Sequence, residues 1–127
     1  MSKIKRVCLV DDATGMQRLG SAFLKGMGIE VVVARDGYEA LRVIHEEEPD
    51  ACFIDIEMPN LNGLQVVSIM RGNNRFTDIP IAVLSGASSP FDRQKGLLAG
   101  ANLYLTKPFT KDTIAKAIAD MEMLSDE

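Results

Sequence analysis

The 127-residue sequence has little cysteine, a single histidine, no cluster of basic residues and no long apolar run. Two cysteines, Cys8 and Cys52, are too few for a disulfide scaffold, and His45 has no second histidine with which to bind a metal. No apolar run approaches the roughly 20 residues of a membrane span. The sequence begins with basic residues, but the apolar stretch that follows them ends in two aspartates and is too short for a signal peptide. With 14 basic and 18 acidic residues, direct nucleic-acid binding is disfavoured. We expect a cytoplasmic protein that does not insert into membranes.

The residues that are present predict an α/β fold. The length fits a single domain spanning residues 1–127. Short apolar runs alternate with longer amphipathic stretches, and the runs VCLV and ACFID lack polar alternation, as in strands covered on both faces. This order predicts a parallel sheet inside a three-layer α/β/α sandwich. Gly26 and Gly28 are expected to end the first helix, and Thr110 to cap the last. The expected strands are 7–10, 30–34, 51–55, 79–85 and 102–105, and the expected helices are 16–27, 38–48, 63–71, 92–99 and 111–124.

Polar residues follow the carboxyl ends of four predicted strands. Ligands bind at that edge of an open parallel sheet, so these residues are expected to meet there. Carboxylates held together repel one another unless a cation intervenes, and Mg²⁺ prefers carboxylate and phosphoryl oxygens. A nucleophilic carboxylate, a hydroxyl, a lysine and Mg²⁺ together indicate phosphoryl transfer. The residues concerned are Asp11, Asp12, Asp55, Ser85 and Lys107.

Four motifs resemble those of the response-regulator receiver domain of bacterial two-component signalling. They are VDD at 10–12, DIEMPNLNG at 55–63, LSG at 84–86 and KPF at 107–109, and the resemblance extends from about residue 4 to residue 124. It implies a CheY-like, flavodoxin-like fold with strand order 2-1-3-4-5. The segment from Ser88 to Lys111 is most similar to regulators of twitching motility and related chemotaxis-like systems.

The resemblance also implies a role for each site residue. Asp55 would accept the phosphoryl group, and Ser85 and Lys107 would contact its oxygens. Asp12, Asp55 and the backbone carbonyl of Glu57 would bind Mg²⁺ directly, with Asp11 acting through water. The Lys107–Pro108 peptide bond would be cis. The domain would catalyse its own phosphorylation and dephosphorylation while serving mainly as a signalling switch.

A switch and its partners are implied in the same way. Ser85 would move toward the phosphoryl group and the ring of Tyr104 would follow, which changes a surface formed by residues 88–99, Tyr104 and 111–121. The phosphoryl donor would be a sensor histidine kinase or a small molecule such as acetyl phosphate. Since 127 residues leave no room for an output domain, we expect a stand-alone regulator whose output is binding to a downstream effector protein. A monomer and a weak, phosphorylation-linked dimer both stay open.

Some residues depart from the family pattern or belong to the core. Glu57, two residues after Asp55, places a carboxylate beside the phosphoryl site. Ala87, two residues after Ser85, neither positions nor strongly blocks a water molecule. The sequence therefore does not predict the lifetime of the aspartyl phosphate. Cys8 and Cys52 precede Asp11 and Asp55 by three residues on strands expected to be neighbours, and we interpret both as buried core residues.

Three other functions deserve comparison with the phosphorylated switch. A receiver-like module that docks without phosphorylation would have little use for the intact set of acids, Ser85 and Lys107. An aspartyl phosphatase typically carries a D-x-D pattern on its first strand, whereas this chain has Asp11-Asp12-Ala13. A flavin carrier of the same topology would need hydroxyls and amides in a first loop that is acidic here.

Overall fold

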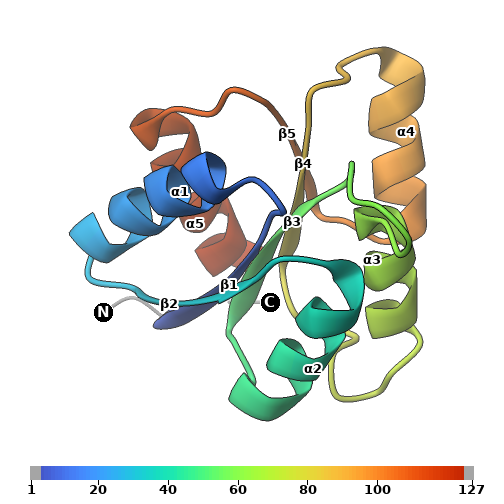
Figure 1. The fold of residues 1–127 in the computed structure, drawn as a ribbon, viewed down its shortest axis with the longest axis horizontal. Helices are drawn as coiled ribbons and strands as arrows, with labels where there is room; N and C mark the ends of the chain where they lie inside the picture. Colours follow the sequence, from blue (N-terminus) through green and yellow to red (C-terminus); the bar gives the residue numbers. More distant parts are fainter. Residues whose placement is uncertain (1–3, 125–127) are drawn as a thin grey trace.

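The computed structural model describes residues 4–124, which form a parallel sheet with helices on both faces (Figure 1). The strand order is β2-β1-β3-β4-β5, and every neighbouring pair is parallel. This confirms the predicted flavodoxin-like α/β fold. The strands are β1 (Arg6–Val10), β2 (Glu30–Ala34), β3 (Ala51–Asp55), β4 (Ile81–Ser85) and β5 (Leu103–Thr106); the helices are α1 (Thr14–Gly26), α2 (Gly37–Glu47), α3 (Gly63–Arg71), α4 (Pro90–Ala99) and α5 (Lys111–Leu124).

Each face of the sheet has its own apolar core, because successive side chains of a strand point to opposite faces. On β1, Val7 and Leu9 pack with α1 and α5, whereas Cys8 and Val10 pack with α2 and α3. The central strands β3 and β4 are buried along their whole length, as their apolar sequences predict. Cys8 and Cys52 lie opposite each other in register, and both are free and fully buried. Their interpretation as core residues is therefore correct.

Helix ends differ by a residue or two from the sequence expectation. The fourth helix begins at Pro90 rather than at residue 92, because the Ser89 side chain accepts a hydrogen bond from the Asp92 amide and proline fits the first helical turn. The first helix begins at Thr14, two residues before the expected start, and ends at Gly26, one residue before residue 27 but at one of the two glycines expected to stop it; Gly28 then adopts a positive φ of 80°. The Thr113 amide donates to Thr110 Oγ1 at 3.2 Å, which is the expected cap of the last helix.

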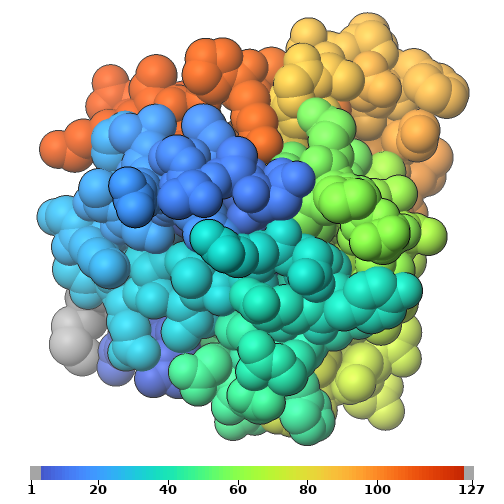
Figure 2. Space-filling model, in the orientation of Figure 1, coloured from blue at the N-terminus to red at the C-terminus, as the bar shows by residue number. Residues whose placement is uncertain are grey.

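The topology brings the carboxyl ends of β1 and β3 side by side at the centre of the sheet. From β1 the chain continues to β2 on one side of the sheet, whereas β3, β4 and β5 extend the sheet on the other side of β1. Functional sites of open α/β sheets lie beyond such a reversal. At the upper right of Figure 2, green atoms of the segment after β3 adjoin the yellow and orange atoms of the β4–α4 region. Within residues 4–124, no helix is both long and apolar enough to cross a membrane.

Candidate functional site

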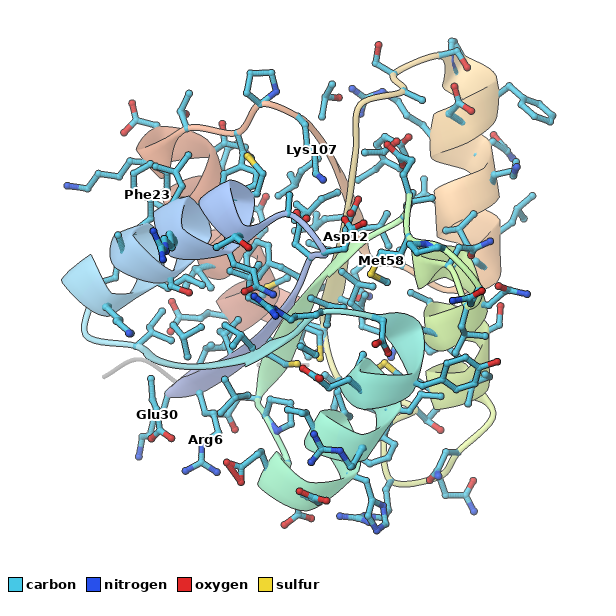
Figure 3. The ribbon with its side chains drawn as sticks, in the orientation of Figure 1. Arg6, Asp12, Phe23, Glu30, Met58 and Lys107 are labelled. Atoms are coloured by element: carbon cyan, nitrogen blue, oxygen red, sulfur yellow. The ribbon has the colours of Figure 1, made fainter. Side chains whose placement is uncertain are left out.

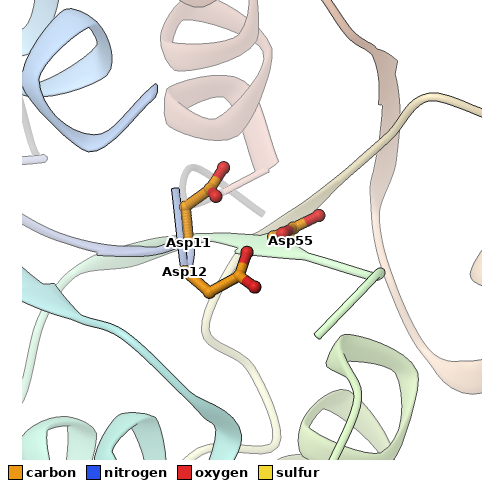
Figure 4. Close-up of side chains that lie close together, drawn as sticks. All are labelled: Asp11, Asp12 and Asp55. Carbon is orange, nitrogen blue, oxygen red and sulfur yellow. The ribbon is translucent and has the colours of Figure 1, made fainter. Parts of the chain in front are cut away.

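Three carboxylates gather at the carboxyl ends of β1 and β3 (Figure 4). One oxygen each of Asp11, Asp12 and Asp55 lies within 4.8 Å of the others. Asp11 and Asp55 are each 1% exposed, whereas Asp12 is open to solvent. The site is therefore an acidic cluster with a buried floor and one open side.

The position of Asp55 depends on the tight start of α3. The amide of Gly63 donates to the Ile56 carbonyl at 3.1 Å, and a Cβ atom at residue 63 would collide with the backbone carbonyl of Asp55. Glycine is needed here because α3 begins directly against the end of β3. The Asn62 side chain then caps the helix by accepting from the Gln65 amide. These contacts hold the phosphoacceptor candidate at a fixed strand end.

Lys107 brings a positive charge to the two buried carboxylates. Its Nζ lies 3.0 Å from Asp55 Oδ1 and 3.1 Å from Asp11 Oδ2. Figure 3 shows its side chain extending from the end of β5 toward the region of Asp12. The Lys107 amide donates to the Ser85 carbonyl at 2.7 Å, and the Lys107–Pro108 peptide bond is cis. One ammonium group thus contacts two members of a cluster of three carboxylates.

Burial and the neighbouring charges together change the protonation of the site. The pKa of Asp55 is raised from 3.8 to about 6, mainly by burial; the Asp11 charge also raises it, while Lys107 and the Glu57 amide oppose the increase. Burial alone would lower the pKa of Lys107, but its contacts with Asp55 and Asp11 outweigh that effect and the pKa is raised. Lys107 therefore stays charged, while Asp55 resists ionisation.

The donor set fits a hard divalent cation. Asp11 Oδ2 is buried and has no aligned hydrogen bond within residues 4–124, so its contact with Lys107 is an ion pair only. Its second oxygen accepts from the Ala13 amide at 2.9 Å. A buried oxygen with spare capacity beside two further carboxylates suits Mg²⁺, which prefers oxygen ligands.

The last residue of β4 carries the predicted hydroxyl. Ser85 is 1% exposed, and its Oγ accepts from the Ala87 amide at 3.0 Å. The amide of Gly86 donates to Glu57 Oε1 at 2.9 Å, while the Glu57 amide donates to Asp55 Oδ1 at 3.2 Å. The loops that follow β3 and β4 are therefore joined by a side chain directly beside Asp55.

Tyr104 is linked to the same loop. Its hydroxyl donates to the Ala87 carbonyl at 2.6 Å, and the Arg93 guanidinium lies over its ring at 5.3 Å from the centroid. A Cβ atom at Gly96 would lie 2.8 Å from the ring, so the absence of a side chain there makes room for the tyrosine. The structure thus tethers Tyr104 to a backbone carbonyl two residues after Ser85.

Two supporting contacts were not found by sequence reasoning. Gln17 on α1 is buried, and its amide nitrogen donates to the carbonyls of Asp11 and Ala34 at 2.6 and 3.1 Å. It holds the end of β1 in place. A lone glutamine on an amphipathic helix gives no sequence signal for such a role. The contact between Glu57 and Gly86 joins residues 29 positions apart, and no spacing rule predicts it.

Comparison with known proteins places this geometry in a family. A sequence model of the response regulator receiver domain matches residues 7–119. Protein PilG of Pseudomonas aeruginosa is 37% identical over 113 residues, which is 89% of this chain and 84% of PilG. The transcriptional regulatory protein PrrA of Mycobacterium tuberculosis is 43% identical over 94% of this chain, but the match covers 49% of PrrA, so the chain spans about half of that relative.

The solved structures agree with the sequence relatives. The chemotaxis response regulator CheY4 of Vibrio cholerae has a TM-score of 0.88 and 31% identity, and the match covers 94% of this chain and 99% of that one. The predicted similarity to chemotaxis-type regulators agrees with this match. The chain belongs to the response regulator receiver domain family, whose members act in two-component signalling.

Proposed function

We propose that this receiver domain accepts a phosphoryl group on Asp55 in a Mg²⁺-dependent reaction and then binds a downstream effector protein through a changed α4-β5-α5 surface. One observation carries the proposal: Lys107 Nζ lies 3.0 Å from Asp55 in a cluster of three carboxylates. A nucleophile, a fixed cation and oxygen donors for a metal thereby share one strand edge.

The reaction is a displacement at phosphorus. An Asp55 carboxylate oxygen attacks the phosphorus of the donor and forms a new P–O bond. The P–N bond of a phosphohistidine, or the P–O bond of acetyl phosphate, breaks, and its electron pair leaves with the donor. Lys107, already beside Asp55, pairs with the phosphoryl oxygens as negative charge gathers there. Ser85 lies at the neighbouring strand end, where its hydroxyl donates to the same oxygens.

Mg²⁺ would be held by Asp12, Asp55 and the Glu57 carbonyl, with Asp11 acting through water. When bound, it supplies positive charge that neutralises the donor and the carboxylates together. The residues alone leave a buried oxygen of Asp11 without an aligned partner. Burial, with a smaller contribution from the Asp11 charge, raises the pKa of Asp55 to about 6 in the metal-free protein.

The output is a movement of the β4–α4 loop. If Ser85 turns toward a phosphoryl oxygen, it gives up its bond with the Ala87 amide, and Ala87 is also the residue that holds the Tyr104 hydroxyl. The ring and α4 then respond together. On α4, Phe91 and Leu98 are 72% and 77% exposed, which is apolar surface that a partner protein would cover.

The partners follow from the chemistry. We propose a sensor histidine kinase as the physiological donor and an effector protein as the reader. We place the reaction in the cytoplasm, in keeping with two cysteines that remain free and buried.

Intact mass spectrometry tests the proposal. The protein is incubated with acetyl phosphate, with or without Mg²⁺, alongside Asp55→Asn and the matched control Asp78→Asn, which alters an exposed aspartate before β4. We expect one phosphoryl adduct on the wild type and on the control, dependent on Mg²⁺ and absent from Asp55→Asn. If neither an adduct nor beryllofluoride binding is found in the presence of Mg²⁺, the proposal is wrong and a phosphorylation-independent docking module is the better interpretation.

A further inference from the structure

The carboxylate of Glu57 bridges two loops at the site. Glu57 follows β3 and Gly86 follows β4, and the Gly86 amide donates to Glu57 Oε1 at 2.9 Å. The two segments adjoin in Figure 2, where green meets yellow. Glu57 is exposed, so burial does not force this contact. Here the Gly86 amide, next to Ser85, donates to a carboxylate of the same chain rather than to an external anion.

This bond belongs to a continuous series that runs from Asp55 to Tyr104. The Glu57 amide donates to Asp55 Oδ1, and the Gly86 amide donates to the Glu57 carboxylate. One residue later, the Ala87 carbonyl accepts from the Tyr104 hydroxyl. Glu57 is therefore bonded to the residue directly before the one whose backbone holds the tyrosine.

A phosphoryl group on Asp55 would compete with Glu57. A phosphorylated side chain carries a charge of about −1.5 to −2 near neutral pH. The Glu57 amide already contacts Asp55, so its carboxylate would face the new dianion at short range and be repelled. The Gly86 amide sits beside Ser85, and a phosphoryl oxygen is a stronger acceptor for it than a solvent-exposed carboxylate.

We propose that Glu57 is an internal anion that holds the Gly86 amide in the unphosphorylated protein and must leave when Asp55 gains a phosphoryl group. The inference rests on the proposed function and adds a positioning residue to it. Glu57 keeps the β4–α4 loop in its resting position and opposes the phosphorylated state. Loss of its side chain removes a competitor for the Gly86 amide and lowers the free energy of the phosphorylated state relative to the resting state.

Beryllofluoride binding at saturating Mg²⁺ measures this competition without a chemical step. Three variants are compared with the wild type: Glu57→Ala, which removes the acceptor; Glu57→Gln, which keeps a neutral acceptor; and Asp92→Asn, which removes a nearby charge that does not contact Gly86. Asp92 lines the same pocket as Glu57 but bonds with Ser89. We expect Glu57→Ala to bind beryllofluoride about tenfold more tightly, Glu57→Gln to lie between, and Asp92→Asn to stay within about twofold.

The amide resonance of Gly86 reports on its hydrogen bond to Glu57, and the control Asp92→Asn accounts for the effect of a nearby charge. In the resting protein it should shift upfield in Glu57→Ala and stay in place in Asp92→Asn. Any one of three results would overturn the inference while leaving the proposed function intact. These are equal beryllofluoride affinities of the wild type and Glu57→Ala, an unshifted Gly86 resonance in Glu57→Ala, and an equal gain in affinity in Asp92→Asn and Glu57→Gln. If none of the four proteins binds beryllofluoride, the proposed function fails as well.

Discussion

Replacing Asp55 by asparagine should stabilise the metal-free protein. The pKa of Asp55 is raised from 3.8 to about 6, mainly by burial. The folded protein thus holds the proton more tightly than the unfolded chain, so ionisation costs stability above about pH 6 and nothing below about pH 3.8. Between these limits the free energy of unfolding falls as the pH rises.

The magnitude follows from that shift. About two pKa units at 1.36 kcal/mol each give a cost of about 3 kcal/mol at neutral pH, and the favourable contact with Lys107 is already included. Because the exposed Asp12 side of the site admits water, screening reduces the cost to about 1–2 kcal/mol. Asparagine keeps the shape of the side chain without the charge, and it should recover this amount.

Urea denaturation at pH 7.5 in EDTA measures the gain, and the same pair at pH 5 should show about half of it. Asp78→Asn serves as the control and should stay within about 0.5 kcal/mol of the wild type. Saturating Mg²⁺ should remove most of the advantage of Asp55→Asn, because the metal relieves the same repulsion. If the variant is less stable than the wild type, or if its gain does not change with pH, the ionised Asp55 carboxylate does not destabilise the folded protein.

Three further predictions test other parts of the structure. Mg²⁺ at ten times its dissociation constant should raise the free energy of unfolding, measured by urea titration, by about 1.4 kcal/mol. Asp12→Asn should abolish most of this increase, and an equal increase in both proteins would contradict the assignment of Asp12 as a ligand. Arg71→Lys should cost about 2–3 kcal/mol in the same assay, since the guanidinium donates to four backbone carbonyls and to the Asn102 side chain; a neutral result would show that these bonds are replaceable. Gly96→Ala should displace the Tyr104 ring, which a Cβ atom would approach to 2.8 Å, and should shift its aromatic resonances; unchanged resonances would mean that α4 yields instead.

The acidic site could be predicted because it depends on topology rather than on loop detail. Asp11, Asp12 and Asp55 end two buried strands, and a parallel sheet must bring such ends to one edge. Lys107 follows a third strand and reaches the same edge. The predicted start of α4 at residue 92 is wrong, because the capping of the helix by Ser89 and the proline in its first turn set the start at Pro90.

Other features needed coordinates. The bond between Glu57 and Gly86 depends on the path of two irregular loops, and the packing of Tyr104 on Gly96 depends on the rotation of α4. Side-chain periodicity does not encode either of these. Gln17 shows the same limit, because its role comes from a buried amide meeting two backbone carbonyls. The roles of the site residues in phosphoryl transfer stay predictions until the chemistry is measured.

Reductive trapping locates the residue that carries the phosphoryl group. Protein treated with acetyl phosphate and Mg²⁺ is reduced with borohydride, which converts an aspartyl phosphate to homoserine, and peptide mass spectrometry then locates the change. We expect homoserine at position 55, formed only when Mg²⁺ is present. Homoserine at Asp11 or Asp12 instead, or its absence from a protein that is folded and binds Mg²⁺, would contradict the assignment of Asp55 as the phosphoryl acceptor.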